Sequence, residues 1–193
     1  MAVPKHQTGT FTYADYLTWP EGERWELIHG IAYNMSPAPG RAHQRMTTRL
    51  TRIIESRTEN STCETYVAPF DVRLGPEENA TDEQTETVVQ PDISLFCDLT
   101  KLDERGAHGA PDLVVEVLSP STGYKDQTEK LALYESAGVR EYWIVNPDAA
   151  YVMVYRLESD GRFGKPDYYR RDDALISNIL GDPPIPLSEM FRK

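Results

Sequence analysis

The sequence predicts an α/β protein in which helices flank a mixed central sheet. The first of three observations is an amphipathic stretch at residues 42–57, where apolar side chains recur at helical spacing: Met46, Leu50, Ile53 and Ile54. The second is a group of apolar runs typical of strands, at residues 92–97, 112–118, 141–147 and 151–157. The third is a helical stretch at residues 126–138, between the second and third of these runs. A sheet covered by helices is the arrangement that buries such a set of elements.

Shorter elements are expected on the N-terminal side of this core. Thr12 and Asp15 have the spacing of a capping box, which predicts a short helix at residues 12–19. The pair His29-Gly30 suits a tight turn between two short strands, so a hairpin is expected there.

Two further expectations concern how single elements bend, begin and end. Residues 62–74 are expected to form one strand that bends at Pro69. In the helical stretch that follows the second apolar run, Asp126 is the expected N-cap, Glu129 closes the capping box and Gly138 ends the helix.

Length and composition are those of a soluble globular protein. The chain has 193 residues, of which 39% are hydrophobic and 26% charged. One domain is expected, with a core at about 41–157, an N-terminal hairpin at 24–36 and a C-terminal extension at 158–193. No apolar run approaches the roughly 20 residues of a membrane span, and the N-terminus lacks the apolar core of a signal peptide, so a cytoplasmic protein without membrane contact is expected.

Cys63 and Cys97 are 34 positions apart without metal-ligand spacing and are expected to be reduced, buried thiols.

The formal net charge of −11 argues against extended electrostatic binding of nucleic acid, because phosphate contacts need a basic surface. A small basic patch or a bridging metal ion is compatible with it. Four arginines form a stripe on the helix predicted at residues 42–57 and just before it: Arg41, Arg45, Arg49 and Arg52. Such a stripe is usually only a solvated helix face. In a chain this acidic it is also the place where phosphate contacts are expected. Arg45 and Arg49 are therefore secondary site residues.

Glu116 stands in the middle of the second apolar run, so its side chain points to one of the two covered faces of the sheet. Burying an ionised carboxylate costs several kcal/mol unless a cation or strong hydrogen bonds meet it. On a helical wheel of the following helix, at about 100° per residue, Lys130 lies in the middle of the face that carries Leu133 and Tyr134. A lysine on a packing face is uncommon unless it is paired, so Lys130 is the expected partner of Glu116. A snorkelling lysine or a purely structural ion pair is the alternative.

Two aspartates are candidates for the second carboxylate that works together with Glu116. If the first two apolar runs form an antiparallel hairpin, Asp92 lies beside Glu116, whereas Asp112 lies at the other end of the strands, about 13 Å from Glu116 at ~3.3 Å per residue. Geometry therefore favours Asp92 and leaves Asp112 as a secondary candidate. Adjacent carboxylates repel each other, which raises the pKa of one of them or recruits a divalent cation. Oxygen ligands with a nearby lysine suit Mg²⁺ or Mn²⁺.

His43 is a further candidate on the first core helix. It projects within about 40° of Leu50 and Ile54, so it points toward the sheet, either as a satisfied core histidine or as a catalytic one. The sequence contains no GxSxG, HExxH, CxxC, phosphate-loop or GxGxxG motif, so the serine-hydrolase, zinc-protease, redox and nucleotide-cofactor interpretations lack their minimal parts.

Several segments of the chain carry a family resemblance: WELIHGIAYNMSPAP, AHQRM, VVQPDISLFCD, GAPDLVVEVLSPST and DQTEKLALYESAGVREYWIVNP. Together and in this order they resemble the Uma-two family of restriction endonucleases, a branch of the PD-(D/E)XK nuclease superfamily. The resemblance implies a restriction-endonuclease-like core, with elements in the order helix, three strands, helix and strand. This order agrees with the one read from the apolar pattern.

The resemblance also assigns roles to single residues. Asp92 corresponds to the aspartate of the superfamily, and Glu116 to the acidic residue of its (D/E)XK element. Leu118 stands where that element has its lysine. Some branches place the lysine on the following helix, which is the position of Lys130, and His43 corresponds to the family's histidine on the first core helix.

The resulting hypothesis is an endonuclease that hydrolyses phosphodiester bonds of DNA with Mg²⁺ or Mn²⁺ held by Asp92 and Glu116. Lys130 and His43 would complete the catalytic set, and the resemblance implies a homodimer. The rival hypothesis is a catalytically inactive binding or assembly protein that keeps the nuclease fold, with Glu116 and Lys130 as a buried ion pair.

Overall fold

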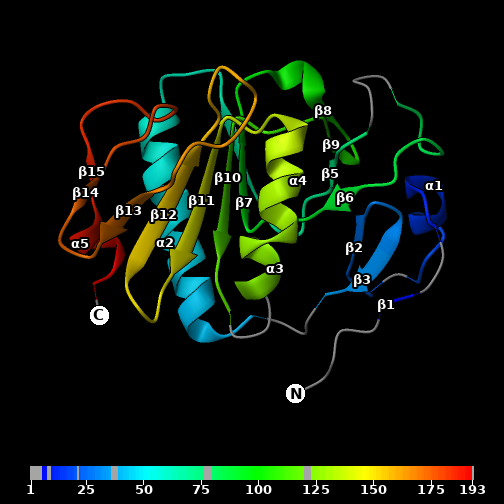
Figure 1. Cartoon of the computed structure of the whole chain (residues 1–193), viewed down its shortest axis with the longest axis horizontal. Coiled ribbons are helices and arrows are strands. Elements are labelled where there is room, and N and C mark those ends of the chain that lie inside the picture. The colour runs from blue at the N-terminus through cyan, green and yellow to red at the C-terminus, as the bar shows by residue number, and fades with distance from the viewer. Residues whose placement is uncertain are drawn as a thin grey trace. The chain divides into compact units, whose positions relative to one another are not determined.

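The chain forms two compact units, each built from segments that are far apart in the sequence. The computed structural model describes residues 6–7, 10–20, 22–35, 39–75, 80–119 and 123–192 (Figure 1). One unit contains Met1–Pro39, Ala68–Gln90 and Thr100–Ala110, and the other contains Gly40–Val67, Pro91–Leu99 and Pro111–Lys193. The single domain expected from the chain length stays a prediction, and residue 36 of the expected hairpin lies outside the described residues.

A six-stranded mixed sheet forms the centre of the second unit, in the order β13-β12-β11-β10-β7-β4. The strands are β4 (Glu64–Val67), β7 (Ile93–Phe96), β10 (Leu113–Val117), β11 (Glu141–Asn146), β12 (Tyr151–Arg156) and β13 (Asp167–Arg170). β10 and β11 are parallel, and the other neighbouring pairs are antiparallel. The mixed central sheet predicted from the apolar runs is therefore confirmed.

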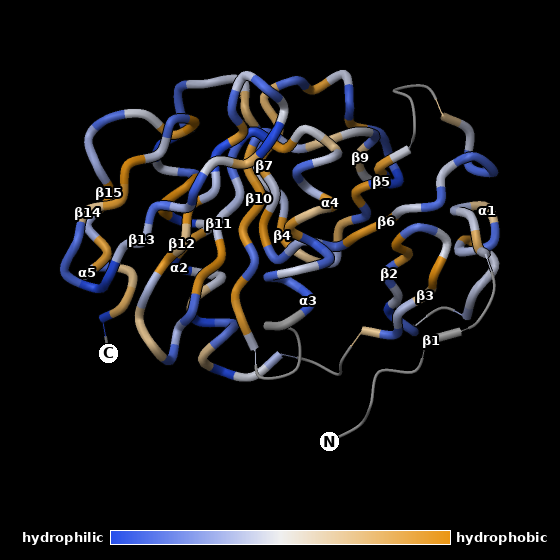
Figure 2. The backbone as a smooth tube through the Cα atoms, viewed as in Figure 1, coloured by the Kyte–Doolittle hydropathy of each residue, from blue (hydrophilic) through white to orange (hydrophobic). Residues whose placement is uncertain are grey.

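Helices cover both faces of this sheet (Figure 1). α2 (Arg41–Thr58) packs on one face, where Leu50 and Ile54 share a core with Val115 and Val117 of β10. α3 (Gly123–Gln127) and α4 (Glu129–Ala137) lie on the other face. The chain ends with β14 (Ala174–Leu175), β15 (Ile185–Pro186) and α5 (Leu187–Met190). Figure 2 shows β10 and β11 as largely hydrophobic segments, which fits strands covered on both faces.

Asp126 does not cap the helix that was expected to begin with it. It lies inside α3, and the helical path is interrupted at Thr128, whose φ is −128° and ψ −79°, before α4 begins. The Asp126 side chain is 3% exposed, and its Oδ1 lies 3.9 Å from Nζ of Lys130. Its carboxylate thus faces a buried cation. Gly138 ends α4 as expected, with φ +84°.

The first unit holds a seven-stranded sheet in the order β1-β3-β2-β6-β5-β9-β8. Its elements are β1 (His6–Gln7), α1 (Tyr13–Tyr16), β2 (Trp25–Ile28), β3 (Ile31–Asn34), β5 (Val72–Arg73), β6 (Val88–Val89), β8 (Leu102–Asp103) and β9 (Gly106–His108); the 3-10 helix η1 (Leu99–Lys101) precedes β8. The hairpin turn is confirmed, since His29 and Gly30 both have positive φ, at 49° and 74°. The capping box is confirmed as well, because the main-chain N–H of Thr12 donates to Oδ2 of Asp15 at 2.9 Å.

Residues 62–74 do not form one bent strand. The segment divides into β4, which belongs to the six-stranded sheet, and β5, which belongs to the seven-stranded sheet. Pro69 lies between them and has no N–H to continue a strand ladder. The proline indicated an interruption, but the local sequence carried no sign that the chain changes sheets.

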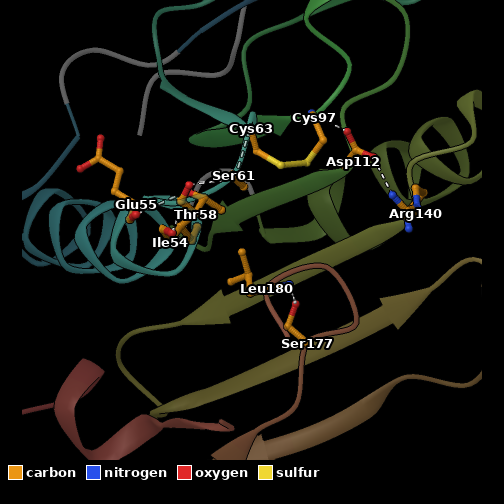
Figure 3. The surroundings of a disulfide bond; sticks show 10 residues. All are labelled: Ile54, Glu55, Thr58, Ser61, Cys63, Cys97, Asp112, Arg140, Ser177 and Leu180. Atoms are coloured by element: carbon orange, nitrogen blue, oxygen red, sulfur yellow. Dashed lines mark hydrogen bonds and ion pairs between the residues drawn. A yellow bond between two sulfur atoms is a disulfide. The ribbon is translucent and has the colours of Figure 1, made fainter. Parts of the chain in front are cut away.

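Cys63 and Cys97 form a disulfide, so the expectation of reduced thiols is wrong (Figure 3). Glu64 of β4 pairs with Phe96 of β7, and the next positions along both strands bring the two cysteines opposite each other, with Cα atoms 3.9 Å apart. The number of residues between two cysteines says nothing about cross-strand register, which is why their spacing led to the wrong prediction.

The expected cytoplasmic location stays a prediction, and a disulfide is more typical of oxidising compartments. Within the described residues, none of the helices has the length and apolar character that a membrane crossing requires.

Reducing this disulfide is expected to destabilise the protein by about 3 to 4 kcal/mol, because the bond closes a loop of intermediate length in the unfolded chain. Urea unfolding with and without dithiothreitol measures the effect. The double variant Cys63→Ser, Cys97→Ser should unfold at the urea concentration of the reduced wild type and should not respond to the reductant. An unchanged midpoint for the reduced wild type would contradict the prediction.

Candidate functional site

Glu116 of β10 is a buried carboxylate that receives two side-chain hydrogen bonds from α4. Nζ of Lys130 lies 2.8 Å from Oε1 of Glu116, and the hydroxyl of Tyr134 donates to the same oxygen at 2.9 Å. Glu116 and Lys130 are each 4% exposed, and Tyr134 is fully buried. The inward direction of Lys130 and its contact with Glu116, both expected from the helical wheel, are therefore present in the structure. The contact supplies the cation that a buried carboxylate requires.

Asp92 lies immediately before β7 and directly beside Glu116. The antiparallel register pairs Val115 with Ile93, so the next position on each strand brings Glu116 opposite Asp92. Oδ2 of Asp92 accepts a hydrogen bond from the main-chain N–H of Val117 at 2.8 Å, and the N–H of Asp92 lies 3.4 Å from Oε2 of Glu116. The two carboxylates expected to work together are thus neighbours at one end of the β7-β10 pair.

His43 reaches this pair from α2. Its Nε2 lies 3.0 Å from Oδ2 of Asp92, and the side chains of His43 and Asp92 are 14% and 20% exposed. Burial opposes the charged form of His43, but the hydrogen bond to Asp92 and its negative charge outweigh burial and raise the pKa of the imidazole above its ordinary value. A protonated His43 therefore forms an ion pair with Asp92.

This ion pair predicts a pH-dependent contribution to stability in the metal-free protein. Because the folded-state pKa of His43 lies above its unfolded value, the protonated ring stabilises the fold. The contribution is complete below the unfolded pKa, near about 6.5, and is lost as the pH rises through the folded pKa. Urea unfolding of wild type and His43→Gln in EDTA, between about pH 5 and 8, should show a stability gap that narrows with increasing pH. A gap independent of pH would contradict the prediction.

The secondary candidates lie apart from these contacts. Asp112 is at the opposite end of β10, where its carboxylate accepts hydrogen bonds from the N–H of Cys97 and from Arg140, both at 2.8 Å (Figure 3). Arg45 is exposed on α2. Arg49 is half-buried and donates to the main-chain oxygen of Met190 at 3.0 Å and to that of Arg192. Asp112 and Arg49 thus take part in holding other segments of the second unit.

Two residues at the site were not singled out from the sequence. The helical wheel predicts for Tyr134 only an apolar packing role, and the local pattern predicts a helix cap at Asp126. Both lie four positions from Lys130, a spacing that brings side chains together on one helix face. That spacing is the signal that would have found them once Lys130 was recognised as buried.

The donor atoms fit a hard divalent cation held by few protein ligands. Asp92 and Glu116 supply adjacent carboxylates, and Mg²⁺ typically takes one or two carboxylates while keeping waters and substrate phosphates as further ligands. In the described part of the chain, no group of three or more His, Cys, Asp and Glu side chains is arranged to hold a metal ion. A cation held by Asp92 and Glu116 would need water or substrate oxygens as its further ligands.

The mixed sheet and the helices on its two faces are the arrangement of the restriction-endonuclease-like fold. A solved structure described as "a putative nuclease belonging to DUF820 from Anabaena variabilis ATCC 29413" has this fold, with a TM-score of 0.73 and 20% sequence identity, and the match covers 94% of this chain and 97% of that one. A family model described as "Uma2: Putative restriction endonuclease" matches residues 13–183. The chain therefore belongs to this family, as the quoted segments led us to expect.

A relative of this chain occurs in Synechocystis sp. (strain ATCC 27184 / PCC 6803 / Kazusa), where it is described as the uncharacterized protein slr1290. The two are 26% identical over 168 residues, which is 86% of this chain and 84% of the relative. The similarity thus extends over most of both chains.

Proposed function

We propose that this protein is a metal-dependent endonuclease that hydrolyses phosphodiester bonds of DNA. Membership of a family described as restriction endonucleases supports this reaction class. The observation that carries the proposal is the position of Lys130, whose Nζ lies 2.8 Å from Glu116 beside Asp92. Two adjacent carboxylates can hold a divalent cation, and a buried ammonium group can stabilise negative charge, both of which assist phosphodiester hydrolysis.

Each residue of the site has a distinct part in this proposal. Asp92 and Glu116 would hold Mg²⁺ or Mn²⁺, together with a main-chain carbonyl near Val117. A cation bound there would lower the pKa of a coordinated water and neutralise charge on the scissile phosphate. Lys130 would orient the attacking water or, as the neutral amine, take its proton, and as an ammonium group it would stabilise the negative charge that develops on the phosphate. His43, hydrogen-bonded to Asp92, positions the substrate or the water.

The charge distribution is compatible with a nucleic-acid substrate despite the net charge of −11. The first unit has 12 acidic and 5 basic residues, whereas the second has 19 and 15. α2, which carries His43, contains five arginines and one glutamate. Arg45 is exposed on this helix and is the proposed phosphate contact. We also propose that two copies act together on the two strands of a duplex, which sedimentation of the protein with and without DNA tests.

Nicking of supercoiled plasmid tests the proposed activity. The wild type should convert plasmid to the open-circular form in the presence of Mg²⁺ or Mn²⁺. This conversion should stop when EDTA is added. Calorimetric titration with Mn²⁺ should show binding that is lost in Glu116→Ala.

The rival function is binding or assembly without catalysis, and one observation favours it. Glu116 and Lys130 satisfy each other as a buried ion pair, and Leu118 stands where the (D/E)XK element has its lysine. A wild type that neither binds Mn²⁺ nor nicks plasmid would contradict the endonuclease and favour this rival.

A further inference from the structure

The hydroxyl of Tyr134 and the ammonium group of Lys130 converge on one oxygen of Glu116. Both donors come from α4, one turn of helix apart, and both bond to Oε1 at 2.9 and 2.8 Å. The other oxygen, Oε2, lies 3.4 Å from the main-chain nitrogen of Asp92. The two oxygens of Glu116 are thus differently oriented: Oε1 toward the helix and Oε2 toward Asp92.

Tyr134 is itself held in place by an aromatic partner. Its ring packs edge-on against the ring of Tyr142 in β11, with centroids 4.9 Å apart and an interplanar angle of 62°. The hydroxyl of Tyr142 donates to the main-chain oxygen of Asp126 at 3.0 Å, which ties β11 to the end of α3. Both rings are fully buried, so neither can swing into solvent. The Tyr134 hydroxyl is therefore a fixed donor aimed at the carboxylate.

Two hydrogen-bond donors restrict the orientation of a carboxylate group more strongly than a single donor does. Lys130 carries its ammonium group on a flexible stem with rotatable donors, so alone it would tolerate several orientations of Glu116. A tyrosine has two side-chain torsions, both restricted here by packing. We propose that Tyr134 is a positioning residue that fixes the carboxylate plane of Glu116, so that Oε2 is presented beside Asp92 for the cation. This inference rests on the proposed function, since the cation is the one that the endonuclease would use.

Binding of Mn²⁺ to Tyr134→Phe tests the inference, because this substitution removes the hydroxyl and keeps the ring. Loss of a group that orients a metal ligand typically weakens metal affinity by about 10- to 100-fold. We expect that loss for Tyr134→Phe by calorimetry, without a matching loss of fold by circular dichroism. Tyr155→Phe is the matched control: the ring of Tyr155 stacks on Tyr142, but it stands on β12, two strands away from Glu116. Its Mn²⁺ affinity should stay within about twofold of wild type.

A mutant cycle on the metal-free protein tests the same contact without a cation. Removing a hydrogen bond to a charged group changes the unfolding equilibrium constant by about 10- to 100-fold, so Tyr134→Phe should have this effect in the wild-type background. In the background Glu116→Leu, Lys130→Met, the same substitution should have no effect or a stabilising one, because the hydroxyl has lost its acceptor. If the hydroxyl has only a packing role, Tyr134→Phe will change the unfolding equilibrium equally in the wild-type background and in the double variant. That result would overturn the inference.

The outcomes separate this inference from the proposed function. If the wild type binds no Mn²⁺, the endonuclease proposal fails, and the inference fails with it whatever the cycle shows. If the wild type binds Mn²⁺ and Tyr134→Phe binds it equally well, the endonuclease proposal stands and the positioning role of Tyr134 is refuted. A selective loss of Mn²⁺ affinity in Tyr134→Phe, together with coupling in the cycle, supports the positioning role.

Discussion

Asp92→Asn is expected to lower metal-dependent nicking of plasmid DNA by at least about 10³-fold, while the protein stays folded. Asparagine has nearly the shape of aspartate and keeps an oxygen that can accept the hydrogen bond from the N–H of Val117. It lacks the negative charge that would hold a cation beside Glu116. Stabilisation of transition-state charge by a metal ion amounts to several kcal/mol, which corresponds to this loss of rate. The measurement is the initial rate of plasmid nicking at saturating Mg²⁺ or Mn²⁺.

Asp112→Asn is the matched control, because both aspartates follow a proline and flank neighbouring strands. Asp112 bonds to Cys97 and Arg140 at the other end of β10, away from Glu116 (Figure 3). We expect Asp112→Asn to nick plasmid at the wild-type rate, apart from any loss of stability. Equal rates for Asp92→Asn and wild type would remove Asp92 from the proposed site. Loss of activity in a fully folded Asp112→Asn would show that the wrong aspartate had been chosen.

The second large effect is expected for Lys130→Met, which should lower the free energy of unfolding by about 3 to 5 kcal/mol. The substitution removes one partner of a buried ion pair whose side chains are both 5% exposed and leaves Glu116 without its cation. Methionine fills much of the volume of the lysine stem, so the loss reflects the uncompensated charge more than a cavity. Urea unfolding at neutral pH measures the change.

The double variant Lys130→Met, Glu116→Leu separates stability from catalysis. Replacing a buried ion pair by apolar groups of similar volume is often neutral or stabilising, so the double variant should recover most of the stability lost in the single one. It should still fail to nick DNA, because both proposed functional groups are gone. If the single and double variants are equally unstable, the cost does not come from the unpaired charge of Glu116. If the double variant nicks DNA, the proposed catalytic roles are wrong.

Periodicity made much of the candidate site accessible to prediction. Alternation along β10 places Glu116 on a covered face, and the 3.6-residue period of the helix places Lys130 opposite it. A hairpin of β7 and β10 then selects Asp92 over Asp112. These inferences depend on short-range geometry that is the same in every strand and helix, which is why single residues could be named.

Errors arose where partners distant in the sequence decide the outcome. Cys63 and Cys97 meet because β4 and β7 pair in one particular register, and no local pattern specifies that register. Asp126 has the local features of an N-cap, but a buried Lys130 attracts its side chain instead. Tertiary contacts outweigh local preferences in such cases, because an unpaired buried charge costs more than a lost cap.

Repeating backbone geometry made three features predictable from local sequence: the central strands, the two main helices of the second unit, and the inward direction of Glu116, Lys130 and His43. Three contacts could be learned only from the folded chain: Tyr134 and Lys130 share Oε1 of Glu116, Asp92 bonds to both His43 and Val117, and the two cysteines are joined. Such contacts depend on strand register and on how α2 and α4 pack against the sheet. Those features are set by the whole core and not by any one segment of the chain.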